Sequence, residues 1–448
     1  MPTALSTDLY ELTMAAGHYV AGTSRSATFE LSVRGLPRAR GYLLAAGIEP
    51  ALAYLEDLRF TAPEIEYLRR LPQLSRVPAR FFDGYLPGFR FTGDVWAMAE
   101  GEPVFPDEPL LRVTAPLIEA QLVETALLSM VLFQTSVASR ASRMVRAAAG
   151  RPVYEFGARR AHGAEAGVLA GRAAFVGGCS GTSDVEAGLV YGLPLAGTMA
   201  HSWVMSHDTE TEAFVRFMDV YGDRTVLLVD TYDSERAVDR IAAARLAPFG
   251  VRIDSGDLVA ESRRVRARLD ASGLQATKIF ASGDLDERQI AQLVQRRAPI
   301  DVFGVGTALS TSSDAPALGG VYKLVEVERA GRVQPVLKLS PGKGTYPGVK
   351  QVWRIGDGCG ATHDILATGD EPPPRRGRAL LGQVMRRGRR VRSAPPLQEI
   401  RERALRAVDE LPAEVLRLDG PAPYPVTVSD GLARLTGDLQ RRMHAVAG

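Results

Sequence analysis

This chain contains a series of short apolar runs, each followed by a polar or glycine-rich loop, and few folds accommodate such a series. Several segments between the later runs carry apolar residues at helical spacing, as at Val238, Ile241 and Ala242. Strand-like runs that alternate with helices predict parallel strands joined by crossover helices. The seven runs lie at residues 152–156, 173–176, 195, 225–229, 251–253, 277–280 and 302–303.

Two α/β arrangements satisfy this pattern, a doubly wound sheet and a barrel. We favour a closed or nearly closed barrel, because polar loops follow every run and not only the runs at one switch point. In a barrel, the loops after the strands gather at one mouth, which is where enzymes with this architecture place their sites. Residues just after the runs are therefore the candidate functional residues.

The segments on either side of this series have a different pattern. Glycines and prolines break residues 91–113 into short pieces that are typical of a small sheet. A helix with Thr7 as its N-cap is expected over 7–14, and a long helix over 117–149 with Gly150 as its C-cap. Further strands are expected at 26–33, 321–327, 336–339 and 351–355, and further helices at 48–55, 63–71 and, as the terminal helix, 400–418.

Length and composition exclude several classes of protein. A single core stops growing at roughly 250–300 residues, so 448 residues indicate two domains. The 54 Lys and Arg nearly balance the 52 Asp and Glu, so nucleic acid and membrane partners are not expected, and the arginine-rich stretch 375–392 is best read as a solvated face. The only cysteines, Cys179 and Cys359, are too few for a disulfide framework. No run approaches the roughly 20 apolar residues of a membrane span, and we expect a cytoplasmic protein.

The segment 197–207 contains the histidine of most interest. His201 follows a flexible Gly197–Thr198 turn. A histidine near neutral pKa can act as a base, a metal ligand or a phosphoryl acceptor. The alternative is a structural, hydrogen-bonded histidine beside Trp203.

Charged residues and glycines accumulate after the other runs. Alternation along a strand points Arg252 and Asp254 to the same side, either toward one ligand or into an internal salt bridge. The loop 304–307 lies where barrels commonly hold a phosphate, although many such turns only allow close helix packing. Arginines and glycine amides suit phosphates and carboxylates, and aspartates suit sugar hydroxyls or Mg²⁺. The other residues at these positions are Arg159, Arg160, Asp184, Asp257 and Asp284, the last of which could instead cap a helix.

Two enzyme classes fit poorly. A Schiff-base aldolase needs a lysine near the end of a barrel strand, but Lys278 stands at the beginning of its run. A zinc hydrolase needs a compact ligand cluster, but His201 and His207 are six residues apart and no HExxH motif is present. An enzyme acting on a phosphosugar remains.

Eight motifs in this chain together resemble the nicotinate phosphoribosyltransferase family, and they keep the family's order from residue 7 to about residue 354. Eight linked motifs are far more specific than any one of them. They are 7–14 (TDLYELTM), 155–160 (EFGARR), 181–184 (GTSD), 197–202 (GTMAHS), 252–257 (RIDSGD), 303–307 (FGVGT), 319–325 (GGVYKLV) and 338–343 (KLSPGK).

The resemblance implies a type II phosphoribosyltransferase fold, an irregular α/β barrel beside an α/β sandwich domain built from both chain ends. The expected domains are a sandwich over 1–125, completed by 321–448, and a barrel over 126–320 that carries the active site. It also implies a homodimer with shared active sites. The implied reaction joins nicotinate to 5-phosphoribosyl 1-diphosphate, giving nicotinate mononucleotide and diphosphate for NAD biosynthesis. ATP, with Mg²⁺, would be coupled to it through a phosphohistidine, a reaction classed as a ligase or glycosyltransferase.

The resemblance also implies roles for individual residues, with His201, Arg252 and Asp254 as the catalytic set and His201 as the phosphorylated residue. Thr198 and Arg252 would bind nicotinate. The pyridine ring would lie between Phe156 and Tyr10 of the partner subunit. Ribose and diphosphate would face Asp254, Gly283 and Asp284, and the 5-phosphate would face Gly306 and Thr307. The remaining expected substrate contacts are Asp8, Arg159 and Asp184.

Asp184 departs from the family pattern, because many nicotinate enzymes carry asparagine there and the related nicotinamide enzymes carry aspartate. An ionised carboxylate beside the ring substituent would repel nicotinate unless Arg252 or Arg159 neutralised it. Nicotinamide is therefore the alternative base. An alternative of another class is a sugar-phosphate isomerase on a similar barrel, with His201 as general base.

Overall fold

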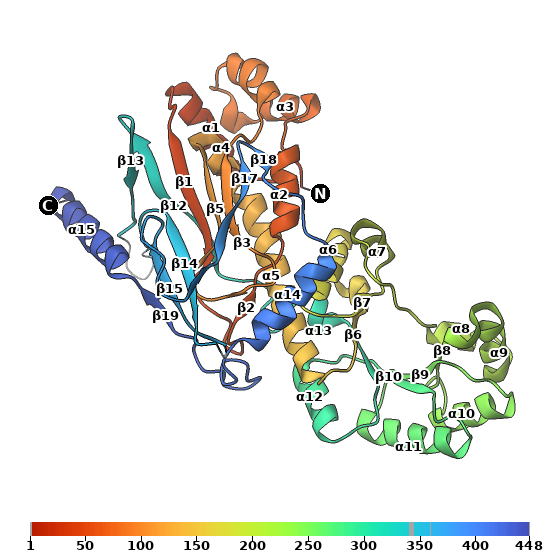
Figure 1. The fold of residues 1–448 in the computed structure, drawn as a ribbon. Helices are drawn as coiled ribbons and strands as arrows, with labels where there is room; N and C mark the ends of the chain where they lie inside the picture. The colour runs from red at the N-terminus through yellow and green to blue at the C-terminus, as the bar shows by residue number, and fades with distance from the viewer. Residues whose placement is uncertain (1, 340–344, 359, 448) are drawn as a thin grey trace. The chain divides into compact units, whose positions relative to one another are not determined.

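The computed structural model describes residues 2–339, 345–358 and 360–447, and the chain divides into two compact units (Figure 1). The first unit comprises residues 1–136 and 317–448, and the second comprises 137–316. The domain bounds expected from the sequence, 125/126 and 320/321, remain predictions. Within the described ranges, no helix combines the length and the apolar character needed to cross a membrane.

An antiparallel sheet of seven strands forms the centre of the first unit, in the order β13-β12-β1-β5-β3-β17-β18. Because β1 pairs with β12, segments from both ends of the chain build this unit. The strands are β1 (Ser26–Val33), β3 (Asp94–Met98), β5 (Pro109–Pro116), β12 (Gly320–Arg329), β13 (Arg332–Pro335), β17 (Leu381–Arg386) and β18 (Arg389–Arg390). A second sheet has the order β16 (Gly377–Ala379), β14 (Lys350–Gly356), β15 (Ala361–Thr368) and β19 (Val426–Val428). A small third sheet pairs β2 (Leu43–Leu44) with β4 (Pro103–Val104).

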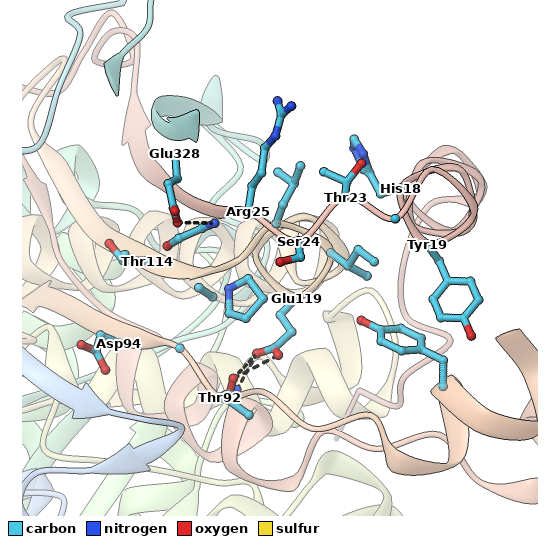
Figure 2. A pocket seen from close by; sticks show the side chains of 18 residues that line it. His18, Tyr19, Thr23, Ser24, Arg25, Thr92, Asp94, Thr114, Glu119 and Glu328 are labelled. Carbon is cyan, nitrogen blue, oxygen red and sulfur yellow. Dashed lines mark hydrogen bonds between the residues drawn. The ribbon is translucent and has the colours of Figure 1, made fainter. Parts of the chain in front are cut away.

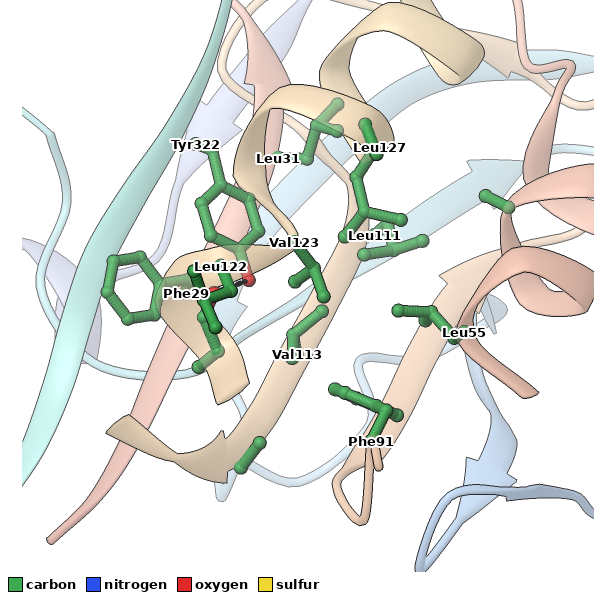
Figure 3. Packing of buried hydrophobic residues seen from close by; sticks show 14 of the residues in the cluster. Phe29, Leu31, Leu55, Phe91, Leu111, Val113, Leu122, Val123, Leu127 and Tyr322 are labelled. Carbon is green, nitrogen blue, oxygen red and sulfur yellow. Dashed lines mark hydrogen bonds between the residues drawn. The ribbon is translucent and has the colours of Figure 1, made fainter. Parts of the chain in front are cut away.

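The core of the first unit lies where helices cover β1 and β5 (Figure 3). Leu127 packs toward Leu111, Leu122 lies beside Phe29, and the rings of Phe29 and Tyr322 stack with centroids 4.9 Å apart. Each such side chain contributes roughly 1.5–3 kcal/mol when fully buried. The helices are α1 (Leu9–Val20), α2 (Ile48–Asp57), α3 (Ala62–Arg69), α4 (Leu117–Leu122), residues 124–136 of α5 (Glu124–Ala147), α14 (Leu397–Asp409) and α15 (Asp430–Ala447).

The second unit is built on a six-stranded parallel sheet with the order β7-β6-β11-β10-β9-β8. The strands are β6 (Val153–Glu155), β7 (Gly181–Thr182), β8 (Val226–Leu228), β9 (Gly250–Ile253), β10 (Lys278–Ala281) and β11 (Val302–Val305). The helices are α6 (Ala164–Val176), α7 (Val185–Tyr191), α8 (His201–Met205), α9 (Glu210–Tyr221), α10 (Ser234–Ala243), α11 (Leu258–Ala271), α12 (Glu287–Gln295) and α13 (Thr307–Ser310).

The strand order identifies this sheet as an irregular barrel. The first strand, β6, pairs with the last, β11, and the strands between follow chain order, so the series has no switch point of a doubly wound sheet. Leu195 forms a parallel bridge with Thr182 and extends the edge beyond β7. No pairing among the described residues joins Leu195 to β8, so the ring is interrupted there, at the segment that contains His201. The predicted type II phosphoribosyltransferase fold is confirmed.

Most expected elements are present, but the predicted strand at 173–176 is wrong. These residues end the helix α6. The run is apolar because this part of α6 is buried, and a short buried run looks alike in a helix and a strand. The strand of this repeat is β7, whose two residues are too short to give a periodic signal.

Four expected boundaries are also corrected. Asp8, not Thr7, is the N-cap of α1, and the Thr7 hydroxyl donates to Glu11 instead. The long helix is interrupted at Val123, between α4 and α5. The strand expected at 336–339 lies at 332–335, because the chain turns at Ala330 and Gly331, both with positive φ. The helix expected at 400–418 is α14, which ends at Asp409, and α15 is the terminal helix.

Candidate functional site

The predicted site residues of the second unit follow the carboxyl ends of its parallel strands. Because parallel strands end at the same edge, their loops share one face of the barrel. Arg252 lies in β9 and Asp254 directly follows it, Gly283 and Asp284 follow β10, and Phe156 follows β6. The others are Asp184 after β7, Thr198 and His201 after the Leu195 bridge, Gly306 and Thr307 after β11, and the exposed Arg159 in a short turn after β6. Asp8 and Tyr10 lie in the first unit, exposed at the start of α1.

Arg252 is the centre of a hydrogen-bonded cluster. Its Nη1 donates to Thr198 Oγ1 at 2.7 Å, and its Nε donates to Ser282 Oγ at 3.0 Å. Its Nη2 lies 3.1 Å from Asp254 Oδ1, and Ser282 donates to the same carboxylate. The prediction that Arg252 and Asp254 face the same side is confirmed, and the internal salt bridge considered as an alternative is present. Residues from three separate loops therefore meet at one guanidinium.

Asp230, which lies two residues after the end of β8, was missed as a site residue. Its Oδ2 accepts hydrogen bonds from Asp254 N at 2.8 Å and from Ser255 Oγ at 2.7 Å. Its Oδ1 is buried and has no partner among the described residues. The signal was available, because Asp230 directly follows its apolar run as Asp254 directly follows the next one.

His201 is the first residue of α8 and is half-buried. Its Nδ1 lies 3.1 Å from the hydroxyl of Thr231, the neighbour of Asp230. Trp203 instead packs on His207, with ring centroids 4.6 Å apart, and His207 Nδ1 lies 2.7 Å from the Trp203 carbonyl oxygen. The structural histidine beside Trp203 is thus His207. His201 instead contacts Thr231, one of the residues that follow the strand ends of the barrel.

Glu155, the last residue of β6, ties three elements together and was not among the predicted site residues. Its fully buried carboxylate accepts from Thr182 Oγ1 at 2.6 Å, Ser310 Oγ at 2.9 Å and Gly157 N at 2.5 Å. Burial raises the pKa of Glu155 above its usual value, and these hydrogen bonds oppose the shift. One signal for Glu155 existed in the sequence, because it is the first residue of the EFGARR motif. The alternation of the strand, however, gave no reason to expect a carboxylate that points into the barrel.

Phe156 and the glycines of the β11 loop lie against each other. A Cβ on Gly304 would meet the Phe156 ring at 2.6 Å, so only glycine allows the ring this close. Gly306 stands at the N-terminal end of α13, and Phe156 N donates to Val305 O at 2.7 Å. The β6 and β11 loops therefore form one wall, with a half-buried aromatic ring in it.

Gly283 and Asp284 form a tight turn against β9. Gly283 has φ +101°, and a Cβ there would lie 2.2 Å from the Asp254 carbonyl oxygen. Asp284 is also left-handed, with φ 47°, and its side chain is exposed. Asp286, not Asp284, caps the following helix α12. The capping role considered for Asp284 is therefore wrong.

Asp184 has a structural task in addition to any role in binding. Its Oδ1 accepts from Ala187 N at 2.8 Å, so it is the N-cap of α7. Asparagine would fill the same role, because both residues are good N-caps. Capping alone therefore does not account for a carboxylate at this position.

The site offers few metal ligands. Among the described residues, no group of three or more His, Cys, Asp or Glu side chains could hold a metal ion. Mg²⁺ commonly keeps several waters and binds through one or two carboxylates plus substrate phosphates. The carboxylate of Asp230 fits that mode, because its Oδ2 accepts from the backbone of Asp254 and its buried Oδ1 has no partner among the described residues.

Two sequence features fall outside the described residues. Residues 340–343 of the KLSPGK motif and Cys359 belong to the parts of the chain that the structure leaves out. The other cysteine, Cys179, is buried.

Three family models match the chain over most of its length. The nicotinate phosphoribosyltransferase N-terminal domain matches residues 5–132, the nicotinate phosphoribosyltransferase family matches 152–341, and the C-terminal domain of the same family matches 374–436. The match over 152–341 contains all the predicted site residues of the second unit.

Curated relatives carry the same name. A nicotinate phosphoribosyltransferase of Mycobacterium tuberculosis is 47% identical over 453 residues, with 99% of this chain and 94% of the relative covered. The Bacillus subtilis enzyme of that name is 42% identical, covering 79% of this chain and 73% of its own, and the human one is 31% identical, covering 97% and 96%.

Two solved structures have similar folds. The crystal structure of human nicotinic acid phosphoribosyltransferase has a TM-score of 0.86 at 29% identity and covers 97% of this chain and 99% of its own. That of a nicotinate-nucleotide pyrophosphorylase from Pyrococcus furiosus has a TM-score of 0.74 at 28% identity and covers 91% and 95%.

Proposed function

The chain belongs to the nicotinate phosphoribosyltransferase family, and from that premise we propose that it joins nicotinate to 5-phosphoribosyl 1-diphosphate. The products are nicotinate mononucleotide and diphosphate, and the reaction is coupled to ATP hydrolysis. The nucleotide product serves NAD biosynthesis. Family membership leaves the isomerase alternative without support.

The observation that carries this proposal is the hydrogen-bonded cluster around Arg252. It places a cation next to Thr198 and between loops that carry carboxylates. Arginine recognises a carboxylate through paired N–H donors. In the proposed complex, nicotinate's carboxylate takes up donors of Arg252 and the hydroxyl of Thr198, and the ring lies against Phe156.

The carboxylates of the cluster suit the chemistry at the ribose. As the bond between C1 and the diphosphate oxygen breaks, its electron pair leaves with diphosphate and C1 takes on oxocarbenium character. Asp254 and Asp284 stabilise that positive charge, and the pyridine nitrogen then supplies the pair for the new bond. Mg²⁺, when bound, takes up negative charge on the diphosphate. Gly306 and Thr307, at the N-terminus of α13, offer backbone and hydroxyl donors for the 5-phosphate.

We propose that ATP coupling runs through phosphorylation of His201. Nδ1 faces Thr231, which leaves Nε2 as the nucleophile. Nε2 attacks the terminal phosphorus of ATP, the bond to the bridging oxygen breaks, and ADP leaves. Water later hydrolyses the phosphohistidine to phosphate. While it is present, the added negative charge biases the neighbouring loops toward the state that binds the phosphosugar tightly.

We further propose a homodimer with shared active sites, in which Tyr10 of the partner subunit closes the base pocket. An apolar surface patch on the second unit, formed by Val185, Leu189 and Val190 of α7 with Leu195, supports association. These side chains are 71%, 85%, 57% and 53% exposed. Contiguous exposed apolar surface of this kind is typical of protein interfaces.

Nicotinamide stays as the second candidate base because of Asp184, whose carboxylate can accept from an amide NH₂. The decisive experiment offers nicotinate or nicotinamide to the purified protein with 5-phosphoribosyl 1-diphosphate and Mg²⁺, with and without ATP. The product is identified by mass. Nicotinate mononucleotide that increases with ATP supports the proposal, whereas nicotinamide mononucleotide alone, or no product from either base, contradicts it.

A further inference from the structure

The first unit contains a cavity of about 800 Å³ with no part in the proposed reaction (Figure 2). It is lined by the end of α1 and the segment that leads into β1, together with residues of β3, β5 and α4. Its size is within the range of roughly 300–1,000 Å³ that small-molecule sites occupy.

Glu119 of α4 is the chemically unusual residue of this cavity. Its side chain faces Thr92 in Figure 2, and the residue is only 8% exposed. The carboxylate accepts from Thr92 N at 2.6 Å and from Thr92 Oγ1 at 3.0 Å. A carboxylate can accept about four hydrogen bonds, so Thr92 uses only part of its capacity.

No ion pair to Glu119 exists among the residues that the structure describes. A buried charge normally requires a partner of opposite sign. Burial accordingly raises the pKa of Glu119, against the hydrogen bonds from Thr92 that lower it. The cavity therefore contains a buried carboxylate that lacks a countercharge.

The rest of the lining also favours a cation. Asp94 and Glu328 add two carboxylates, against one guanidinium, that of Arg25, and the imidazole of His18. In Figure 2 the side chain of Arg25 extends away from Glu119 and Thr92. Glu328 uses one oxygen to accept from Ser26 N at 3.4 Å, a long bond that leaves the carboxylate available.

An aromatic and apolar wall stands beside this acidic part. The ring centroids of Tyr19 and Tyr85 lie 5.1 Å apart, and Leu117 and Ile118 complete the apolar wall. Burial, and next the charge of Glu119, raise the pKa of Tyr85 to about 12, as expected for a phenol near that carboxylate. Aromatic faces attract cations, most strongly when the pair is desolvated.

We propose that this cavity binds a small organic cation, whose amidinium or ammonium group pairs with Glu119 and whose apolar body lies against Tyr19 and Tyr85. The ligand supplies the positive charge that the protein does not. Recognition therefore depends on the charge of the ligand and not only on its shape.

Benzamidine tests the proposal, with benzyl alcohol and benzoate as neutral and anionic probes of similar size. Isothermal titration calorimetry on the full chain should give saturable binding of benzamidine and none of benzoate. Glu119→Gln should weaken benzamidine binding at least tenfold, because the neutral amide removes the negative charge. The amide keeps much of the shape of the carboxylate, so the variant tests the charge itself. Glu66→Gln, which alters an exposed carboxylate of α3 outside the cavity, should leave binding unchanged.

The wild-type protein gives a second readout that needs no variant. Because the raised pKa of Glu119 leaves the group partly protonated at acidic pH, benzamidine should bind more tightly as pH rises through that pKa. The other ionisable residues of the lining are His18, Tyr19, Arg25, Tyr85, Asp94 and Glu328, and the Arg80 guanidinium lies 5.8 Å from the centroid of the Tyr19 ring. Equal binding of benzamidine and benzyl alcohol, no saturable binding, or unchanged affinity in Glu119→Gln would overturn the proposal.

Discussion

At the scale of single residues, Arg252 shows why a lysine cannot take its place. Its guanidinium contacts Thr198, Ser282 and Asp254 through three different nitrogens. A lysine ammonium carries its donors on one nitrogen and cannot reproduce this fork. Hydrogen bonds to charged groups contribute about 1.5–3 kcal/mol.

Arg252→Lys should therefore lower kcat/KM for nicotinate by roughly ten- to a hundredfold, the rate equivalent of that energy. Steady-state kinetics with each substrate varied in turn measure the effect. Arg216→Lys is the matched control, because Arg216 pairs with Glu212 on the surface of α9. Equal losses in both variants would show that Arg252 has no special part in binding the base.

Gly283 combines a left-handed backbone with close contact to Asp254. Gly283→Ala should cost about 1–2 kcal/mol for positive φ, and about 1–3 kcal/mol more because the new methyl must displace the Asp254 carbonyl. Gly273→Ala isolates the first cost, since Gly273 has φ +79° with nothing within 4 Å. Urea unfolding of both variants measures the difference, and equal midpoints would contradict the account.

At the scale of elements, the junction of α1 and α5 should make stability depend on pH. Burial first, and then the charge of Glu11, raise the pKa of Glu124 to about 7, while Lys323 opposes the shift. A carboxyl with a raised folded pKa favours the neutral form. Its contribution to stability is therefore fully present below about pH 4.5 and is lost as pH rises to about 7.

Glu124→Gln cannot ionise, so it should be more stable than wild type at pH 8 by on the order of 2 kcal/mol. Near pH 4.5 the two proteins should differ little. Urea midpoints across this pH range test the sign, with Glu66→Gln as an exposed control. A variant less stable than wild type at pH 8 would refute the assignment.

Elements with a strong local signal were predictable from the sequence, and the others were not. The strand expected at 26–33 has the same bounds as β1. Its apolar residues lie within one regular, mostly buried segment, so the local sequence was enough to predict it. Residues 173–176 misled because a buried helix end and a buried strand share the same apolar composition. β7, with two residues, is fixed by its pairing to Tyr154 and Glu155, a contact that no local pattern encodes.

The same limit applies to the site. Arg252 and Asp254 were predictable because Arg252 lies in β9 and Asp254 directly follows it, so that the alternation of the strand sets the side of both. Asp230 gains its role by accepting hydrogen bonds from Asp254 N and Ser255 Oγ, which directly follow β9. Glu155 gains its role by accepting from Thr182 and Ser310. Those contacts exist only after the barrel has formed.

At the scale of the whole molecule, the proposed dimer depends on the apolar patch of α7 and Leu195. Leu189→Glu places a charge on its most exposed residue and should shift the protein toward monomer, with loss of activity if active sites are shared. Analytical ultracentrifugation measures the assembly. Val333→Glu is the control, since Val333 is 63% exposed on β13, away from the patch in sequence and unit. A wild-type monomer that is fully active would contradict the proposal.

We propose that His201 couples ATP to phosphoribosyl transfer, and a comparison of wild type with His201→Ala tests this coupling. Both proteins receive nicotinate, 5-phosphoribosyl 1-diphosphate and Mg²⁺, with and without ATP, and the rate of nicotinate mononucleotide formation is followed. We predict that ATP accelerates the wild type, whereas His201→Ala retains only a slow turnover that ATP does not change. Undiminished stimulation by ATP in His201→Ala would contradict the account.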